Sequence, residues 1–195
     1  LGQQAAEALA EARQTVADCL HCRPEEIYFT SGGTEADNWA LRGVAELMAL
    51  KGRKGGHIIT SAIEHHAVLH TAQYLEKQGY EVTYLPVDGR GLVDPAALEG
   101  AIRPDTILIS IMAANNETGV VQPIRELASA AHTAGALFHT DAIQGYLHIP
   151  LDVTELGVDA MTVAAHKIGG PVASGALYLK TRTPLRPRIF GGGQE

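Results

Sequence analysis

Cysteine is scarce in this chain, and its scarcity argues against two classes of protein. The 195 residues include two cysteines, Cys19 and Cys22, in the segment Cys-Leu-His-Cys. Two cysteines cannot build a disulfide framework. A redox pair of this spacing sits at a helix N-terminus, where the dipole stabilises a thiolate, but this pair ends a predicted helix just before Pro24. No set of further metal ligands lies nearby. We therefore predict packing roles in a reducing, cytoplasmic compartment.

Positive charge and long apolar runs are also lacking. The chain has 15 Lys and Arg against 22 Asp and Glu, a net charge of −7. This balance argues against nucleic acid or an anionic membrane as the main partner. No apolar run approaches the roughly 20 residues of a membrane span, and no signal peptide is visible. Because Leu1 is not methionine and lies next to a helical pattern, we expect a chain truncated at its start.

What the sequence does contain is a regular alternation of strand and helix patterns. The run Thr106–Ala113 is continuously apolar, as expected for a strand buried on both faces. The alternation predicts an α/β fold of three layers, α/β/α, around a mostly parallel sheet. Predicted helices cover residues 3–20, the stretch that follows residues 31–35 and runs to about residue 50, 66–77, 95 onward and 123–133. Predicted strands cover 27–30, 57–61, 80–85, 106–113, 137–141, 160–164 and 176–179.

A lysine at the end of an apolar strand is the first candidate for chemistry. The run Met161–Ala165 leads into Lys167, and Gly169-Gly170-Pro171 then prevents a regular helix. A lysine in a turn is usually just solvated. Held between a buried strand and a tight turn, however, Lys167 is expected to be partly desolvated, which favours its attack on a carbonyl group.

A carboxylate at the end of a second strand is the natural partner for this lysine. His139 and Asp141 stand at i and i+2, so they share one face of the predicted strand. Asp141 could simply be a turn or capping acid. Alternatively, it could face a pyridinium nitrogen, which together with a reactive lysine is what pyridoxal phosphate chemistry requires. Gln144 follows within reach of the phenolic oxygen of such a ligand.

Three further segments each allow two interpretations. Thr30–Glu35 opens a helix, so it could bind phosphate or could be a capping box with Ser31 as the cap. Glu64-His65-His66 could ligate metal, offer a flat ring for stacking, or form a polar loop. Asn115–Gly119 could aim amide donors at a ligand or could be a turn.

In this order, the segments resemble the large, cofactor-binding domain of the cysteine desulfurases, in the class V aminotransferase group of fold-type I pyridoxal phosphate enzymes. The resemblance covers nearly the whole chain. Its ending, Gly191–Glu195, is typical of the branch that supplies sulfur for iron–sulfur cluster assembly. The matching segments are residues 30–35, 64–68, 115–124, 139–144, 166–171, 175–178 and 191–195.

The resemblance implies a role for each of four side chains around the cofactor ring. Lys167 binds pyridoxal 5'-phosphate covalently and moves the substrate proton. His65 stacks on the ring and can act in acid–base steps. Asp141 pairs with the pyridinium nitrogen, and Gln144 reaches the phenolic oxygen.

The remaining implied contacts concern the phosphate and the substrate. Gly33, Thr34 and His166 bind the phosphate, and Asn116 contacts the cofactor and the substrate carboxylate. No metal is implied. Over residues 1–195 we therefore expect one pyridoxal phosphate-binding large domain, truncated at both ends and lacking the small C-terminal domain.

The implied reaction is conversion of L-cysteine to L-alanine, with sulfur passed on as an enzyme persulfide. The implied partners are a second copy of the chain, in a homodimer, and a sulfur-acceptor protein such as an iron–sulfur scaffold. The alternatives are a selenocysteine lyase, a small-amino-acid aminotransferase or a non-catalytic binding module of the same fold. A nucleotide-binding domain is disfavoured because no Gly-x-Gly-x-x-Gly unit is present.

The chain departs from the family pattern at three places. Ala164 stands where the family usually has a serine that binds phosphate, and Val172-Ala173 replaces the usual Lys-Gly after Pro171. The family's nucleophilic cysteine follows the Gly-Gly-Gly segment, and neither Cys19 nor Cys22 matches it. We therefore expect that the chain as given does not desulfurate cysteine.

Overall fold

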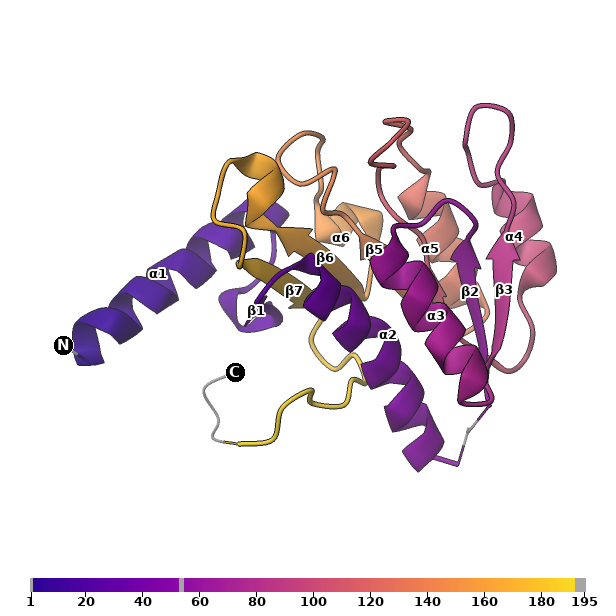
Figure 1. Cartoon of the computed structure of the whole chain (residues 1–195), viewed down its shortest axis with the longest axis horizontal. Helices are drawn as coiled ribbons and strands as arrows, with labels where there is room; N and C mark the ends of the chain where they lie inside the picture. The colour runs from indigo at the N-terminus through magenta and orange to yellow at the C-terminus, as the bar shows by residue number, and fades with distance from the viewer. Residues whose placement is uncertain (1, 53–54, 192–195) are drawn as a thin grey trace.

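Within the residues that the structure describes, the strands form one seven-stranded sheet in the order β1-β7-β6-β5-β4-β2-β3 (Figure 1). The computed structural model describes residues 2–52 and 55–191, so residues 192–195 of the predicted Gly191–Glu195 motif lie outside it. The strands are β1 Ile27–Thr30, β2 His57–Ser61, β3 Glu81–Leu85, β4 Thr106–Ser110, β5 Leu137–Asp141, β6 Ala160–Ala164 and β7 Gly175–Leu179. The helices are α1 Gly2–Leu20, α2 Gly33–Leu50, α3 His66–Lys77, α4 Pro95–Ala101, α5 Ile124–Thr133 and α6 Val153–Leu156, with short 3-10 turns η1 Pro24–Glu26 and η2 Ala165–Ile168.

Five of the strands, β3-β2-β4-β5-β6, run parallel, whereas β7 is antiparallel to both β6 and β1. The reversal has a simple cause. A parallel crossover needs about a dozen residues or more, and the connection between Ala164 and Gly175 is shorter than that. The predicted α/β fold with a mostly parallel sheet is confirmed.

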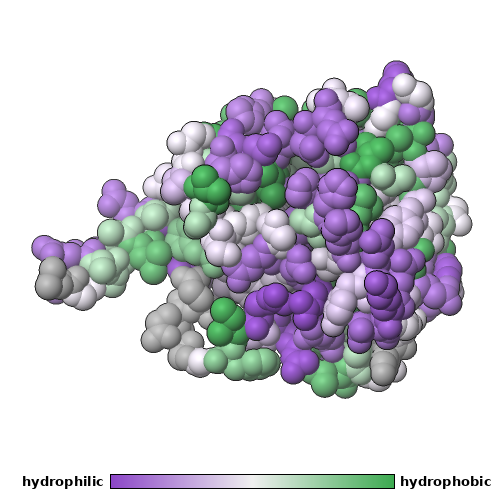
Figure 2. Space-filling view, in the orientation of Figure 1, coloured by the Kyte–Doolittle hydropathy of each residue, from purple (hydrophilic) through white to green (hydrophobic). Residues whose placement is uncertain are grey.

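Side chains that alternate along the strands fill a separate core on each face of the sheet. Ile58 and Leu108 pack with α2 and α3, whereas their neighbours Ile59 and Ile109 pack on the side of α4 and α5. Hydrophilic side chains cover the outer faces of α2 and α3 (Figure 2). The three predicted layers are therefore present.

Differences from the predicted elements are confined to ends and short pieces. Strand β4 stops at Ser110, although the following residues up to Ala113 stay buried. The short elements η1, α6 and η2 were not predicted because three or four residues cannot display a helical period. No helix within the described ranges is both long and apolar enough to cross a membrane.

The prediction that the two cysteines are packing residues is confirmed. Cys19 and Cys22 are half-buried thiols against the core that contains Leu20. Burial, followed by the nearby Glu26 carboxylate, raises the pKa of Cys22 to about 12. Such a thiol stays protonated at neutral pH and is a poor nucleophile.

Candidate active site

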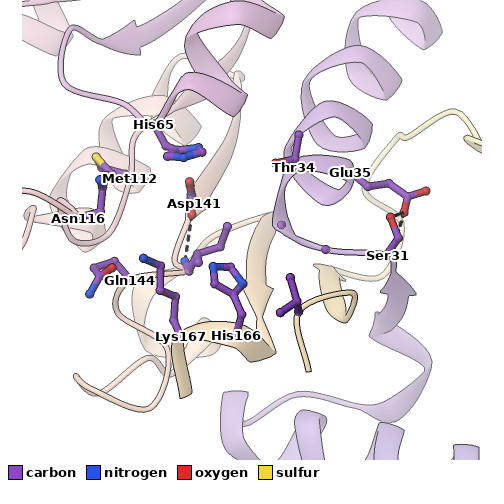
Figure 3. Close-up of a pocket in the computed structure, with 14 residues that line it drawn as sticks. Ser31, Thr34, Glu35, His65, Met112, Asn116, Asp141, Gln144, His166 and Lys167 are labelled. Atoms are coloured by element: carbon purple, nitrogen blue, oxygen red, sulfur yellow. Dashed lines mark hydrogen bonds between the residues drawn. The ribbon is translucent and has the colours of Figure 1, made fainter. Parts of the chain in front are cut away.

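All eight side chains or glycines predicted as site residues line one cavity of about 360 Å³ (Figure 3). The cavity lies where the parallel strands β4, β5 and β6 end and where α2 and α3 begin. Carboxyl ends of parallel strands share one edge of a sheet, so residues distant in sequence converge there. The eight are Gly33, Thr34, His65, Asn116, Asp141, Gln144, His166 and Lys167; Ser31, Gly32, Glu35, Met112, Ile143 and Val172 complete the wall.

Lys167 is brought to this cavity by the turn that follows β6. Gly169 ends that turn at a φ of +81°, a conformation that favours glycine. The Nε2 of His148 donates to the Lys167 carbonyl oxygen at 3.1 Å and so holds the backbone. The side chain itself is exposed. The prediction that Lys167 is partly desolvated is therefore wrong: its turn stands at the surface, although the preceding strand is buried.

Asp141 is the buried acid of the cavity. Its Oδ1 accepts the Ile143 backbone N–H at 3.0 Å. The interpretation of Asp141 as a turn acid is therefore correct for this oxygen. Burial raises the pKa of Asp141 to about 6. A carboxyl group in this state is stabilised as an anion by any cation placed beside it.

His65 has a fixed ring orientation because it caps a helix. It is the N-cap of α3, and its Nδ1 accepts the Ala67 N–H at 3.1 Å. The neutral ring then carries its proton on Nε2. Burial, with smaller contributions from His66 and Lys167, lowers the pKa of His65. His65 is thus a neutral, flat ring on the cavity wall. The metal interpretation gains no support, since no cluster of three potential ligands exists among the described residues.

The beginning of α2 forms the opposite wall. Gly32, not Ser31, is the N-cap, so that detail of the capping interpretation is wrong. Glu35 instead reaches back and accepts both the N–H and the hydroxyl of Ser31 at 2.7 Å. Gly32 has no side chain to cap the first turn, whose N–H groups therefore suit an anion. A Cβ on Gly33 would lie 2.0 Å from Ile143 Cδ1, so a larger residue there would have to displace the Ile143 side chain.

Two adjacent asparagines divide the two proposed roles of their loop between them. Asn115 is buried and builds the turn: its Oδ1 accepts the N–H groups of Glu117 and Thr118, and its Nδ2 donates to Ile63. Asn116 is exposed and lines the cavity. The turn and the amide-donor interpretations are therefore both compatible with the structure, each for one residue.

The donor set of the cavity fits pyridoxal phosphate group by group. Asp141 suits a protonated ring nitrogen, and His65 offers a flat neutral face. The N-terminus of α2 suits the phosphate, and Lys167 is an accessible amine. Ala164 is buried at the end of β6, and its Cβ is 3.6 Å from the position of a Cβ on Gly33. A hydroxyl at residue 164 would therefore lie beside the proposed phosphate site.

Comparison with known proteins gives one result for the whole chain. The aminotransferase class-V family matches residues 1–195. The chain is 51% identical over 195 residues to the cysteine desulfurase IscS of Methanosarcina thermophila and 52% identical over 194 residues to that of Dictyoglomus turgidum. Both alignments cover 100% of this chain and 48% of the relative. The chain thus spans about half the length of the curated relatives it matches.

Solved structures give the same picture at the level of the fold. A NifS-like protein superimposes with a TM-score of 0.94 at 42% identity, over 99% of this chain and 53% of the other. SspA in complex with cysteine superimposes with a TM-score of 0.93 at 41% identity, over 99% of this chain and 55% of the other.

Proposed function

The chain belongs to the class V aminotransferase family, which uses pyridoxal phosphate, and from this we propose that the protein is a cysteine desulfurase that holds the cofactor in the cavity described above. The resemblance stated from the sequence motifs is confirmed at the level of the family. The observation that carries the proposal is the convergence of Lys167, Asp141, His65 and the start of α2 on one cavity. The proposed reaction converts L-cysteine to L-alanine and transfers sulfur to an enzyme thiol.

The proposed division of labour begins with Asp141 and Lys167. When bound, the cofactor supplies a carbonyl carbon for an amine and a ring that withdraws electrons from the substrate Cα. Asp141, with a pKa of about 6, is largely ionised at neutral pH and holds a proton on the ring nitrogen opposite it. The exposed Lys167 amine holds the cofactor and, once released, takes the proton from Cα.

The geometry of His65 favours stacking and hydrogen-bond donation over the role of base. Its Nδ1 lone pair is already used by the Ala67 N–H. Removal of a proton from the substrate by His65 would require this cap to break or the Nε2 proton to leave first. His65 therefore covers the ring and donates from Nε2, and Lys167 remains as the base.

The other predicted contacts complete the proposed site. The first turn of α2, at Gly33 and Thr34, binds the phosphate together with His166. Gln144 is half-buried and reaches the phenolic oxygen, while Asn116 contacts the cofactor and the substrate carboxylate. We propose that residues 1–195 form a single large domain of a longer homodimeric enzyme.

Sulfur transfer needs a thiol other than the two described here. Neither Cys19 nor Cys22 lines the cavity, and the Cys22 thiol stays protonated. We propose that the attacking thiol belongs to a cysteine of the full-length protein, in the region equivalent to the part of the relatives that this chain does not span. This thiol attacks the substrate sulfur and keeps it as a persulfide. The persulfide would then pass to an acceptor protein such as an iron–sulfur scaffold.

The test uses full-length protein reconstituted with pyridoxal phosphate and supplied with L-cysteine and dithiothreitol. We expect sulfide and alanine in equal amounts and, when dithiothreitol is left out, a persulfide that alkylation traps on a cysteine other than Cys19 and Cys22. Formation of a keto acid instead would indicate an aminotransferase. Release of selenium from selenocysteine without sulfide from cysteine would indicate a lyase. Cofactor binding with no turnover of any amino acid would indicate a binding module.

A further inference from the structure

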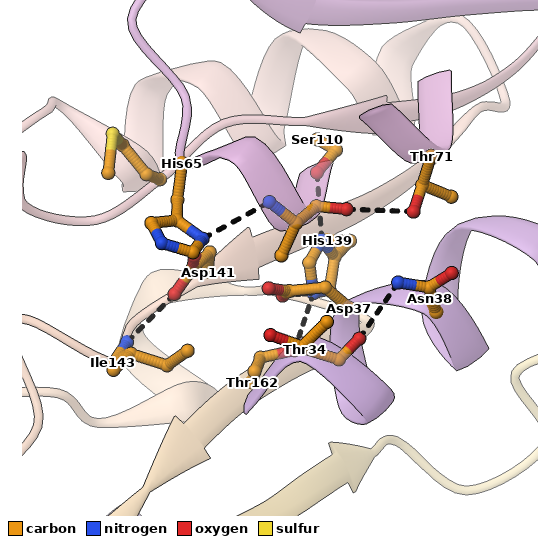
Figure 4. Close-up of polar contacts among 12 residues, drawn as sticks. Thr34, Asp37, Asn38, His65, Thr71, Ser110, His139, Asp141, Ile143 and Thr162 are labelled. Carbon is orange, nitrogen blue, oxygen red and sulfur yellow. Dashed lines mark hydrogen bonds and ion pairs between the residues drawn. The ribbon is translucent and has the colours of Figure 1, made fainter. Parts of the chain in front are cut away.

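A buried acid that the proposed chemistry does not use lies behind the cavity. Asp37, in α2, is fully buried, and neither of its carboxyl oxygens has a hydrogen-bond partner among the described residues. The nearest basic atom is Nε2 of His139, 3.7 Å from Asp37 Oδ1 (Figure 4). A buried carboxylate without donors is costly, so this residue needs an explanation.

His139 cannot supply the missing positive charge. Its Nδ1 is 2.8 Å from the Ser110 hydroxyl, and its Nε2 is 3.0 Å from the Thr162 hydroxyl. Full burial lowers the pKa of His139 to about 3, so the ring is neutral. Because His139 and Asp141 share one face of β5, Asp37 lies behind Asp141 without an intervening cation.

Glu64, just before α3, is the third buried acid of the group. Its Oε1 accepts the Ser61 hydroxyl and the Met112 N–H, whereas its Oε2 has no partner in the described part of the chain. Burial raises the pKa of Glu64 to about 8. Burial and then the Asp141 charge raise the pKa of Asp37 well above its ordinary value, against a smaller opposing effect of the Thr162 hydroxyl.

We propose that Asp37 and Glu64 are held as neutral carboxylic acids and confine the single negative charge of this cluster to Asp141, the one member that faces the cavity. Like charges in a low-dielectric interior repel strongly, so three neighbouring carboxyl groups cannot all ionise. Asp141 ionises first because, of the three acids, it is the one that borders the cavity, where water or a cation can reach it, and it also receives a backbone N–H. Asp37 is thus a positioning residue. The inference rests on the proposed function in one respect: the cation opposite Asp141 is the protonated cofactor ring.

The first test is infrared spectroscopy of the cofactor-free protein at about pH 7, above the pKa of Asp141 and below that of Glu64. The carbonyl stretch of a protonated carboxylic acid stands apart from carboxylate and amide bands. We expect such a band to shift when aspartate is labelled with ¹³C and to disappear in Asp37→Asn. Asp159→Asn is the matched control, since Asp159 is buried but accepts the Phe138 N–H and a His132 ring nitrogen.

The outcomes of this test are separable. The absence of a ¹³C-sensitive band in the unsubstituted protein would overturn the proposal, and this measurement needs no variant to fold. A band that survives in Asp37→Asn would overturn it too, because another aspartate would then hold the proton. Loss of the band in both variants would mean that the loss reflects a general change of structure, and would count against Asp37 as the protonated acid.

The second test asks whether the neutral acid matters at the cofactor. With a ¹⁵N-labelled ring in the holoprotein, we expect Asp37→Asn to keep the ring nitrogen protonated, because asparagine imitates a neutral acid. Asp141→Asn should lose that proton. A shift of the titration midpoint by more than about one pH unit in Asp37→Asn would show that Asp37 carries charge, and would overturn the proposal. Failure of the protein to bind pyridoxal phosphate would refute the proposed function, while the infrared result would still decide the state of Asp37.

Discussion

The two edges of the sheet treat their buried polar groups in opposite ways. At the amino-terminal edge, His57 is fully buried, and its two ring nitrogens lie 2.8 Å from the hydroxyls of Thr106 and Thr83. Asp159 is likewise satisfied by a backbone N–H and a histidine. At the carboxyl-terminal edge, Asp37 and Glu64 keep oxygens without partners. Of these four residues, the two at the amino-terminal edge are satisfied within the protein, whereas the two with oxygens left unsatisfied lie at the edge that holds the cavity.

The largest effect should come from removing the lysine of the carboxyl-terminal edge. We expect Lys167→Ala to lower turnover of the full-length enzyme by about 10³-fold or more, because both the covalent attachment and the base are lost. The free energy of unfolding should change by less than about 0.5 kcal/mol, since the side chain is exposed. Borohydride reduction and peptide mapping should place the pyridoxyl label on Lys167. A label on Lys180, or full activity in Lys167→Ala but not in Lys180→Ala, would contradict the assignment.

The next effect should come from Asp141→Asn. We expect the fold to persist, the cofactor spectrum to shift and turnover to fall by about 10²-fold, because the ring nitrogen loses its counter-ion. In the cofactor-bound protein the ring cation should lower the pKa of Asp141 below the value of about 6 that burial gives it, so the unsubstituted protein should keep its difference from the variant across this pH range. Absorbance spectra and rates between pH 5 and 8 measure this. Turnover that does not change in the variant at any pH would remove Asp141 from the proposed mechanism.

A matched pair of substitutions compares the two edges directly through stability. Folded Glu64 keeps its proton up to about pH 8, whereas unfolded Glu64 loses it near 4.5, so the folded state binds more protons between these values. Stability therefore falls as pH rises through that window, and Glu64→Gln should remove this fall. Asp159→Asn, at the satisfied edge, should destabilise by about 1–3 kcal/mol at neutral pH.

Thermal unfolding of the cofactor-free variants between pH 5 and 9 measures both changes. The glutamine of Glu64→Gln can still accept the Met112 N–H and the Ser61 hydroxyl, so lost hydrogen bonds should not obscure the result. Equal destabilisation by the two substitutions would mean that the edges do not differ in the way described.

The smallest effect should come from a single added hydroxyl. We expect Ala164→Ser to tighten pyridoxal phosphate binding by up to about 1.5 kcal/mol, or roughly tenfold in Kd, through one charge-assisted hydrogen bond to the phosphate. Ala160→Ser is the control, because it adds the same hydroxyl to the same strand at the opposite edge. Equal or weaker binding in Ala164→Ser, measured by titration, would mean that another group already occupies that position.

The sequence predicted elements and site segments best where local patterns decide them. The bounds of β2 and α3 agree with the predicted strand and helix, because burial in β2 and amphipathic spacing in α3 are continuous over the whole element. The eight site residues, which share one cavity, could be identified from the sequence because glycine, histidine and acidic residues mark strand ends and helix starts locally. Their contacts with the cofactor remain predictions.

What the sequence could not predict depends on residues far apart in the chain. Asp37 is one polar residue within a helix pattern, and only the tertiary fold brings it against His139, about a hundred positions later. The exposure of Lys167 was mispredicted because a buried strand gives no information about how far the next turn projects. Met112 has a weak signal, since it lies within the apolar run Thr106–Ala113, but the bond from its backbone N–H to Glu64 forms only in the tertiary fold.

The pairing of β1 with β7 sets the order in which the cavity can be completed during synthesis. Ile27–Thr30 leads into the start of α2, yet among the described strands it pairs only with Gly175–Leu179, close to the end of the described chain. Closing so large a loop carries an entropic cost that only the finished sheet repays. We therefore expect the strand that leads into α2 to pair only after about residue 179 has left the ribosome, so that this side of the cavity is completed late in synthesis.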